Sequence, residues 1–181
     1  MDKETKEKAI SHPSAINPNI LSFKKVFLLN LVTLGAYTVY WGWKYWEIVK
    51  RVEGSKDHTN VRAFFITLTS FSLFPKILSL AHENGYKEKY NATALSLGLL
   101  VLTAINNRFD HPDLLIYIVV SIAIIFFITL TLSPVINAMN YYLAHNKEDS
   151  NKFNLKTNYP LIATMVFIFV LIAVLSFFAE A

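Results

Sequence analysis

Cysteine is absent from this chain of 181 residues, which excludes disulfide bridges, thiolate metal ligands and cysteine nucleophiles. Charge is scarce as well. Charged residues make up 17% of the sequence, and residues 114–146 and 157–179 contain none. Apolar stretches of that length indicate membrane spans, which need about 20 residues to cross the hydrocarbon core. They exclude soluble enzymes, nucleic-acid-binding modules and small disulfide scaffolds.

Groups that carry out chemistry are also rare in the apolar stretches. Membrane hydrolases and transferases place acids, nucleophiles or metal ligands at bilayer depth, whereas the last two apolar stretches offer only serine and threonine hydroxyls with no partner base. No acidic or histidine relay of the kind expected in a proton-coupled transporter is visible. The five histidines are scattered along the chain. We therefore expect no enzyme activity, no cofactor and no metal site.

The formal net charge of +4 arises from 17 basic and 13 acidic residues. In a membrane protein, lysine and arginine hold loops on the cytoplasmic side and favour anionic headgroups, so we expect no nucleic-acid partner. Residues 1–20 are polar and contain two prolines. Because no apolar run begins there, these residues do not form a signal peptide, and we expect a flexible leader in the cytoplasm.

Five apolar segments follow the leader and form a single membrane domain over residues 21–181. The fourth and fifth segments have the length and purity of ordinary transmembrane helices, whereas the third is shorter. The five segments cover residues 26–43, 63–81, 90–106, 114–136 and 159–178.

The first two segments are less regular than the others. Gly35 lies within segment one, where it fits either the turn of a re-entrant hairpin or close packing inside a helix. In segment two, polar residues recur along one narrow stripe, and Pro75 is expected to break or kink the helix. Ser133 and Pro134 are expected to start a further short helix that runs to Ala144. Segments one and two therefore fit a hairpin or a helix in the membrane plane better than a straight span.

The distribution of lysine and arginine distinguishes two topologies. With a cytoplasmic N-terminus and all five segments crossing, 11 basic residues lie on the cytoplasmic side and 6 on the far side. If segments one and two return to their own side, the numbers become 16 and 1. Strong asymmetry in short loops is the rule. We therefore predict an all-α integral membrane protein with two N-terminal re-entrant or in-plane amphipathic elements followed by three transmembrane helices. Five transmembrane helices are the alternative.

Several residues are candidates for contact with lipid. An aromatic cluster in segment one is typical of the headgroup interface, and a cage for a quaternary ammonium headgroup is the alternative. Lys76 lies inside an apolar stretch, where it fits either contact with a lipid phosphate or extension of its side chain to the interface. The aromatic candidates are Tyr37, Tyr40, Trp41, Trp43 and Trp46.

Weaker candidates for a polar site lie on either side of the fourth segment. Asp110, His111 and Asp113 precede it, and two carboxylates with an imidazole are able to bind a divalent ion or a proton. The same residues equally suit a helix cap. Asn137 and Asn140 follow the segment and are expected to face polar surroundings.

A longer pattern resembles a known family. Residues 31–41 read LVTLGAYTVYW and are followed by Lys44 and Trp46. Together with residues 62–65, 72–74 and 134–140, this string resembles the T-x-G-x-Y-x-x-Y-W signature of a family of small uncharacterised bacterial membrane proteins with several spans. The resemblance extends over roughly residues 21–178. It implies a multi-span fold in the bacterial inner membrane, and it implies no reaction or ligand.

These observations favour a non-enzymatic inner-membrane protein that acts through lipids or partner membrane proteins, as a scaffold or by shaping the membrane. The alternative is a small channel or transporter subunit that works as an oligomer around polar positions such as Asn106, Asn107, Asn137 and Asn140. A lipid-modifying enzyme is the third hypothesis. Residues 94–98 form a small-residue pattern, which fits packing inside the protein or against a second copy of the chain.

Overall fold

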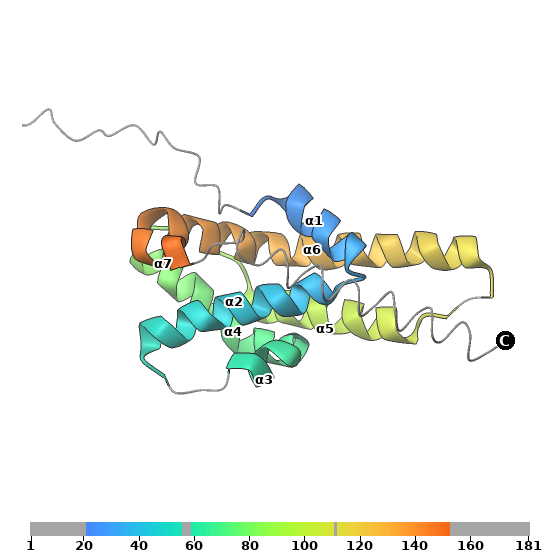
Figure 1. The fold of residues 1–181 in the computed structure, drawn as a ribbon, viewed down its shortest axis with the longest axis horizontal. Coiled ribbons are helices and arrows are strands. Elements are labelled where there is room, and N and C mark those ends of the chain that lie inside the picture. The colour runs from blue at the N-terminus through green and yellow to red at the C-terminus, as the bar shows by residue number, and fades with distance from the viewer. Residues whose placement is uncertain (1–20, 56–58, 111, 153–181) are drawn as a thin grey trace, which may run out of the picture.

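The computed structural model describes residues 21–55, 59–110 and 112–152 (Figure 1). The secondary structure of these residues is entirely α-helical, as predicted. The expected leader, residues 1–20, and the expected last span, residues 159–178, lie outside the described residues. The helices are α1 (Phe23–Val32), α2 (Ala36–Glu53), α3 (Thr59–Phe64), α4 (Ile66–Glu83), α5 (Ala92–Arg108), α6 (Leu114–His145) and α7 (Lys147–Lys152).

The longest helix, α6, organises the fold. It has 32 residues and packs against α1, α4, α5 and α7. Within the described part of the chain, α6 is the one helix long and apolar enough to cross a membrane, judged by length and composition. The fourth apolar segment is therefore a candidate membrane span. Its partner α5 has 17 residues and corresponds to the third segment.

The helix that we expected to start at Ser133 and Pro134 does not exist as a separate element. Helix α6 continues through Pro134 to His145. A proline inside a helix removes one backbone hydrogen bond, but the side chains on both sides of it are held by packing. Leu132 and Val135 are each completely buried. Tertiary packing therefore outweighs the local preference for a break.

The first apolar segment consists of two helices rather than one. Helices α1 and α2 meet at Gly35, which has a φ of +90° and precedes the first residue of α2. This is the left-handed conformation that glycine adopts without strain. The backbone N–H of Gly35 donates to the Asn30 carbonyl over 2.7 Å, and the Thr33 hydroxyl accepts from the Tyr37 N–H over 2.9 Å. Gly35 therefore forms a turn and is not packed inside a continuous helix. We call α1 and α2 together the first hairpin.

The second apolar segment is interrupted at a different place from the one predicted. Helix α4 runs unbroken through Pro75, and the interruption lies at Phe65, between α3 and α4. As at Pro134, buried neighbours hold the helix: Phe74 and Ile77 have no exposed surface. The expected break at Pro75 is therefore wrong. We call α3 and α4 the second hairpin.

Both hairpins turn at the level of the middle of α6. One cavity is lined by Gly35 from the first turn, Phe64 and Ile66 from the second, and Ile128 from α6. In Figure 1 both turns lie part-way along α6, and both hairpins open toward the end where α6 finishes. The N-terminal half of α6 and the end of α5 extend beyond the turns in the opposite direction.

Close packing joins the first hairpin to the second. A Cβ atom on Gly42 of α2 would lie only 2.5 Å from the Cδ1 atom of Ile66, which is 3% exposed. Gly98 of α5 is less crowded, because its Cβ would lie 3.5 Å from the Cγ2 atom of Thr131. The small-residue pattern at residues 94–98 therefore brings Gly98 against α6 inside the protein.

We expect Gly42→Ala to lower the free energy of unfolding by about 1–2 kcal/mol. Overpacking a core position costs about 1–3 kcal/mol, and alanine regains up to about 1 kcal/mol of helix propensity. Gly98→Ala is the matched control, because the new methyl group makes only ordinary contacts. The stability of this variant should not fall. Thermal unfolding of both variants in detergent measures the difference. Equal midpoints for the two variants would show that the contact at Ile66 is not tight.

Candidate functional site

The aromatic cluster of segment one lies in the core of the protein. Four of its rings are almost completely buried: Tyr37 and Trp41 are each 1% exposed, and Tyr40 and Trp46 are each 2% exposed. The Trp41 ring packs against the Tyr45 ring with centroids 4.4 Å apart. These four residues were expected to contact lipid, and their burial contradicts that expectation. The burial of these four rings also leaves none of their faces open to a quaternary ammonium group.

Trp43 differs from the other rings because it is only half-buried. The Lys44 ammonium group lies 4.4 Å from the centre of the Trp43 ring and 3.1 Å from the Glu47 carboxylate. A cation over an aromatic face is attracted by the ring quadrupole. Trp43 is therefore the member of the cluster that remains a candidate for the interface.

Lys76 is paired rather than isolated. Its ammonium group contacts the carboxylate of Glu53, the last residue of α2. Both side chains are about one-third exposed, at 33% and 37%. Pairs this exposed contribute little to stability, so the contact shows where the ammonium group points. It extends toward the end of α2.

The residues before α6 form a helix cap. The Asp113 carboxylate accepts from the backbone N–H groups of Leu115 and Ile116, over 2.8 and 3.1 Å, as an N-cap aspartate does. Asp110 is exposed, and His111 lies outside the described residues. Within those residues, no group of three or more His, Cys, Asp or Glu side chains is arranged to hold a metal ion.

The two asparagines after the apolar part of α6 have different surroundings. Asn137 is exposed. The side chain of Asn140 binds the backbone of Leu21: it accepts from the Leu21 N–H over 3.1 Å and donates to the Leu21 carbonyl over 2.7 Å. Asn140 therefore fixes the start of the first hairpin to α6. Because its amide is engaged in this way, it is not a candidate for lining a pore.

Charged residues gather at the end of the molecule where the hairpins open, and we call this the charged end. There the Arg51 guanidinium donates to the Asp149 carboxylate of α7, which also accepts from the Tyr142 hydroxyl over 2.6 Å. These contacts join α2, α6 and α7. The described charged residues assigned to this end are Lys50, Arg51, Glu53, Glu83, Lys87, Glu88, Lys89, Glu148 and Asp149.

The loop between α4 and α5 belongs to the same end. The Tyr86 hydroxyl donates to the Glu88 carboxylate over 2.9 Å. Burial, and then this hydrogen bond, raise the pKa of Tyr86 to about 12, so the phenol stays protonated at neutral pH. The Tyr86 ring packs against the Tyr141 ring of α6, with centroids 5.2 Å apart. This loop is therefore held against α6.

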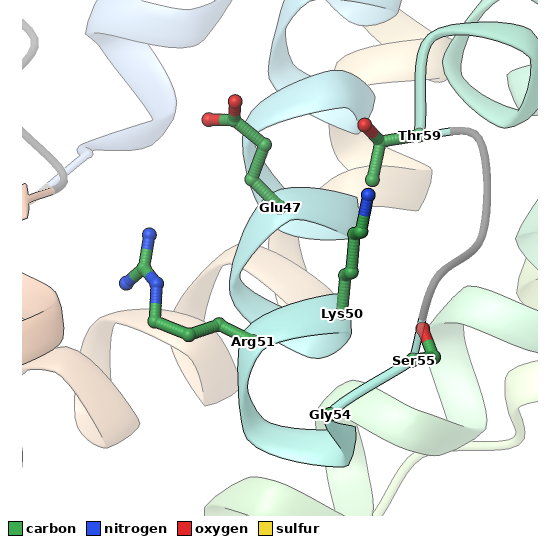
Figure 2. A pocket seen from close by; sticks show the side chains of 6 residues that line it. All are labelled: Glu47, Lys50, Arg51, Gly54, Ser55 and Thr59. Carbon is green, nitrogen blue, oxygen red and sulfur yellow. The ribbon is translucent and has the colours of Figure 1, made fainter.

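Two cavities stand out, and the first lies at the charged end. It has a volume of about 410 Å³ and is lined by polar residues from the end of α2 and the start of α3. Figure 2 shows its six lining residues, with the Lys50 side chain extended toward Thr59. Its lining residues are Glu47, Lys50, Arg51, Gly54, Ser55 and Thr59.

The second cavity lies between the two hairpin turns and has a volume of about 480 Å³. Its lining is mostly apolar, and α5 adds Thr103, Asn106 and Asn107. The sequence indicates these two asparagines as polar positions, but it does not predict that they lie beside the hairpin turns.

Comparison of the chain with family models, with curated proteins and with solved structures found no match.

Proposed function

We propose that this chain is a non-enzymatic protein of the bacterial inner membrane that shapes or scaffolds the lipid bilayer. In this proposal the N-terminus is cytoplasmic, and both hairpins insert from the cytoplasmic side and turn inside the bilayer. Helices α5 and α6 cross the membrane, together with residues 159–178. The partners are membrane lipids, with other membrane proteins or a second copy of the chain in addition.

The conformation of Leu34 is the observation that carries the proposal. Leu34 has a φ of +51° and is the one non-glycine residue with a positive φ in the described chain. Turn positions of this kind in water are usually occupied by glycine, asparagine or aspartate. Here the side chain is an apolar leucine with 64% of its surface exposed. A turn surrounded by hydrocarbon accounts for this choice, because a polar side chain would be costly there.

The remaining exposed side chains support the same orientation. Large apolar residues are exposed beside both hairpin turns. The charges nearest the turns are engaged, because Arg62 lies over the Trp46 ring and Lys44 pairs with Glu47, and the other charges of the hairpins lie toward their open ends. On α6, about 21 Å of helix separates Leu114 from Ile128, at 1.5 Å per residue, and most of its large apolar side chains are exposed. The exposed apolar residues beside the turns are Leu28, Val32, Leu34, Val61, Phe64, Phe65 and Leu68.

Two hairpins that enter one leaflet and turn there would add volume to that leaflet alone. Helical elements inserted to part of the bilayer depth respond to membrane curvature. The mechanism needs no reacting group, which agrees with the scarcity of catalytic residues in the sequence. The hairpins are rigid enough for this role, because α2 packs against α4 and α4 against α6.

Reconstitution into vesicles tests the proposal. We expect vesicles to become smaller or tubular as the ratio of protein to lipid rises, as seen by electron microscopy. The double variant Leu34→Asn, Phe64→Asn changes only exposed turn residues and should shift this effect to higher protein ratios. Vesicles whose size and shape do not change with wild-type protein would rule out membrane shaping.

The cavity between the turns favours a second candidate, a channel or transporter subunit. Asn106 and Asn107 place polar groups in that cavity, at the level of the proposed bilayer interior. A pore would require several copies of the chain. Chemical crosslinking in native membranes distinguishes the two functions: a ladder of oligomers with ion flux supports the channel, and a monomer without flux excludes it.

A further inference from the structure

The polar cavity at the charged end contains a lysine, Lys50, that is unpaired among the residues that the structure describes. In the described chain, Lys50 makes no hydrogen bond or ion pair. The neighbouring charges are engaged: the Glu47 carboxylate accepts from Lys44 over 3.1 Å, and the Arg51 guanidinium binds Asp149. Lys50 is therefore the cation that the cavity offers to a ligand.

Two hydroxyl groups line the same cavity as Lys50. Ser55 follows the end of α2, and Thr59 begins α3. In Figure 2 the Lys50 side chain extends toward Thr59, Ser55 lies beside the base of that side chain, and Arg51 extends to the other side of α2. One ammonium group and two hydroxyl donors suit an anion with several acceptor oxygens. Lysine is a frequent ligand of phosphate, acting as a point charge.

The position of the cavity identifies the kind of phosphate. The cavity lies at the open end of both hairpins, among the charged residues. If the hairpins insert as proposed above, this end lies at the level of the cytoplasmic headgroups. That leaflet carries anionic lipids, which attract basic residues near the membrane. A volume of about 410 Å³ with an open mouth accommodates a phosphate group that remains attached to its glycerol.

We propose that Lys50, Ser55 and Thr59 form a binding site for the phosphate of an anionic phospholipid headgroup such as phosphatidylglycerol. The site rests on the proposed function, because it needs the charged end at the cytoplasmic surface. It gives the protein a preference for anionic over zwitterionic lipid. The choline group of phosphatidylcholine would bring a positive charge toward Lys50 and Arg51.

The test uses the full chain purified in detergent and short-chain lipids that dissolve as single molecules. Dihexanoyl-phosphatidylglycerol should raise the thermal unfolding midpoint in a saturable way, because a ligand that binds only the folded protein stabilises it. Dihexanoyl-phosphatidylcholine should raise it much less. Lys50→Gln should weaken the binding of phosphatidylglycerol about tenfold or more, because it removes a charge-assisted hydrogen bond.

Lys87→Gln is the matched control, because it removes one exposed lysine at the same end of the molecule but outside the cavity. It should bind phosphatidylglycerol as the wild type does. Without lipid, Lys50→Gln should unfold at the wild-type midpoint, since the Lys50 ammonium group has no partner among the described residues. Equal lipid affinities for Lys50→Gln and the wild type would overturn the site.

Two further outcomes overturn the assignment of the ligand. If phosphatidylcholine binds as tightly as phosphatidylglycerol, the site does not select anionic lipid. If inorganic phosphate alone produces the same shift at the same concentration, the ligand is free phosphate rather than a headgroup. Neither outcome affects the proposed function, because vesicle shape is measured separately and depends on the hairpin turns.

Discussion

Leu34→Asp is expected to weaken insertion of the first hairpin by up to about 2.5–3.5 kcal/mol, the cost of an aspartate at the centre of a membrane-spanning helix. The direction of the effect depends on the surroundings of the turn. Leu34 has a φ of +51° and is 64% exposed, and aspartate adopts this backbone conformation more readily than leucine. In water the substitution would therefore be neutral or slightly stabilising. Only hydrocarbon around the turn makes it strongly unfavourable.

The depth of the turn is measured with a fluorophore on a single cysteine at Val32, which is possible because the chain has no native cysteine. In lipid vesicles, spin-labelled acyl chains should quench this fluorophore, and Leu34→Asp should transfer the quenching to aqueous iodide. Val52→Asp is the control, since Val52 is 46% exposed at the charged end. If iodide quenches the fluorophore strongly in the wild type, and Leu34→Asp leaves this quenching unchanged, the first hairpin does not enter the bilayer.

Trp41→Ala is expected to lower the free energy of unfolding by about 3–5 kcal/mol, as removal of a buried aromatic side chain generally does. Trp41 is 1% exposed. Its ring packs against Tyr45 within its own helix and against Phe74 of α4, with centroids 4.4 and 6.3 Å apart. The substitution therefore opens a cavity where the two hairpins meet.

Trp43→Ala is the matched control, because it removes the same side chain from the same helix at a half-buried position. It should cost clearly less than Trp41→Ala. Unfolding in detergent, followed by circular dichroism, measures both variants. If the two substitutions had equal small effects, both rings would lie at the surface, and the headgroup interface would be the correct environment for the whole aromatic cluster.

The elements of the fold that follow from local chemistry could be predicted from the sequence. Gly35 permits a turn, one of the two interpretations that the sequence leaves open, and the structure has that turn at a φ of +90°. The cap at Asp113 follows from an aspartate before a long apolar run. The apolar stretch that forms α6 is recognisable by length and absence of charge. Each of these signals lies within a few neighbouring residues.

The features that depend on packing could not be predicted in the same way. Trp and Tyr are equally suited to an interface and to a core, so the composition of residues 37–46 does not distinguish the two. Pro75 and Pro134 lie inside continuous helices because their neighbours are buried. The contact of Arg51 with Asp149 joins residues 98 positions apart, and no local pattern pairs them.

The polar cavity was missed for a related reason. The end of α2 is predictable, because Lys50 and Arg51 are followed by Gly54, which adopts a left-handed conformation after the last helical residue. That pattern places two basic residues at a helix end but does not show which one is paired. Only the fold shows that Arg51 is bound to Asp149 and that Lys50 extends toward Thr59 (Figure 2).

Cysteine labelling in intact cells tests most directly whether both hairpins enter and leave the membrane on the cytoplasmic side. Single cysteines at Ser55, Lys89 and Asp110 mark the ends of the first hairpin, the second hairpin and α5. A membrane-impermeant thiol reagent should label only Asp110→Cys from outside, whereas all three should react once the membrane is opened. Labelling of Ser55→Cys in intact cells would show that the first segment crosses the bilayer, and would contradict the re-entrant arrangement.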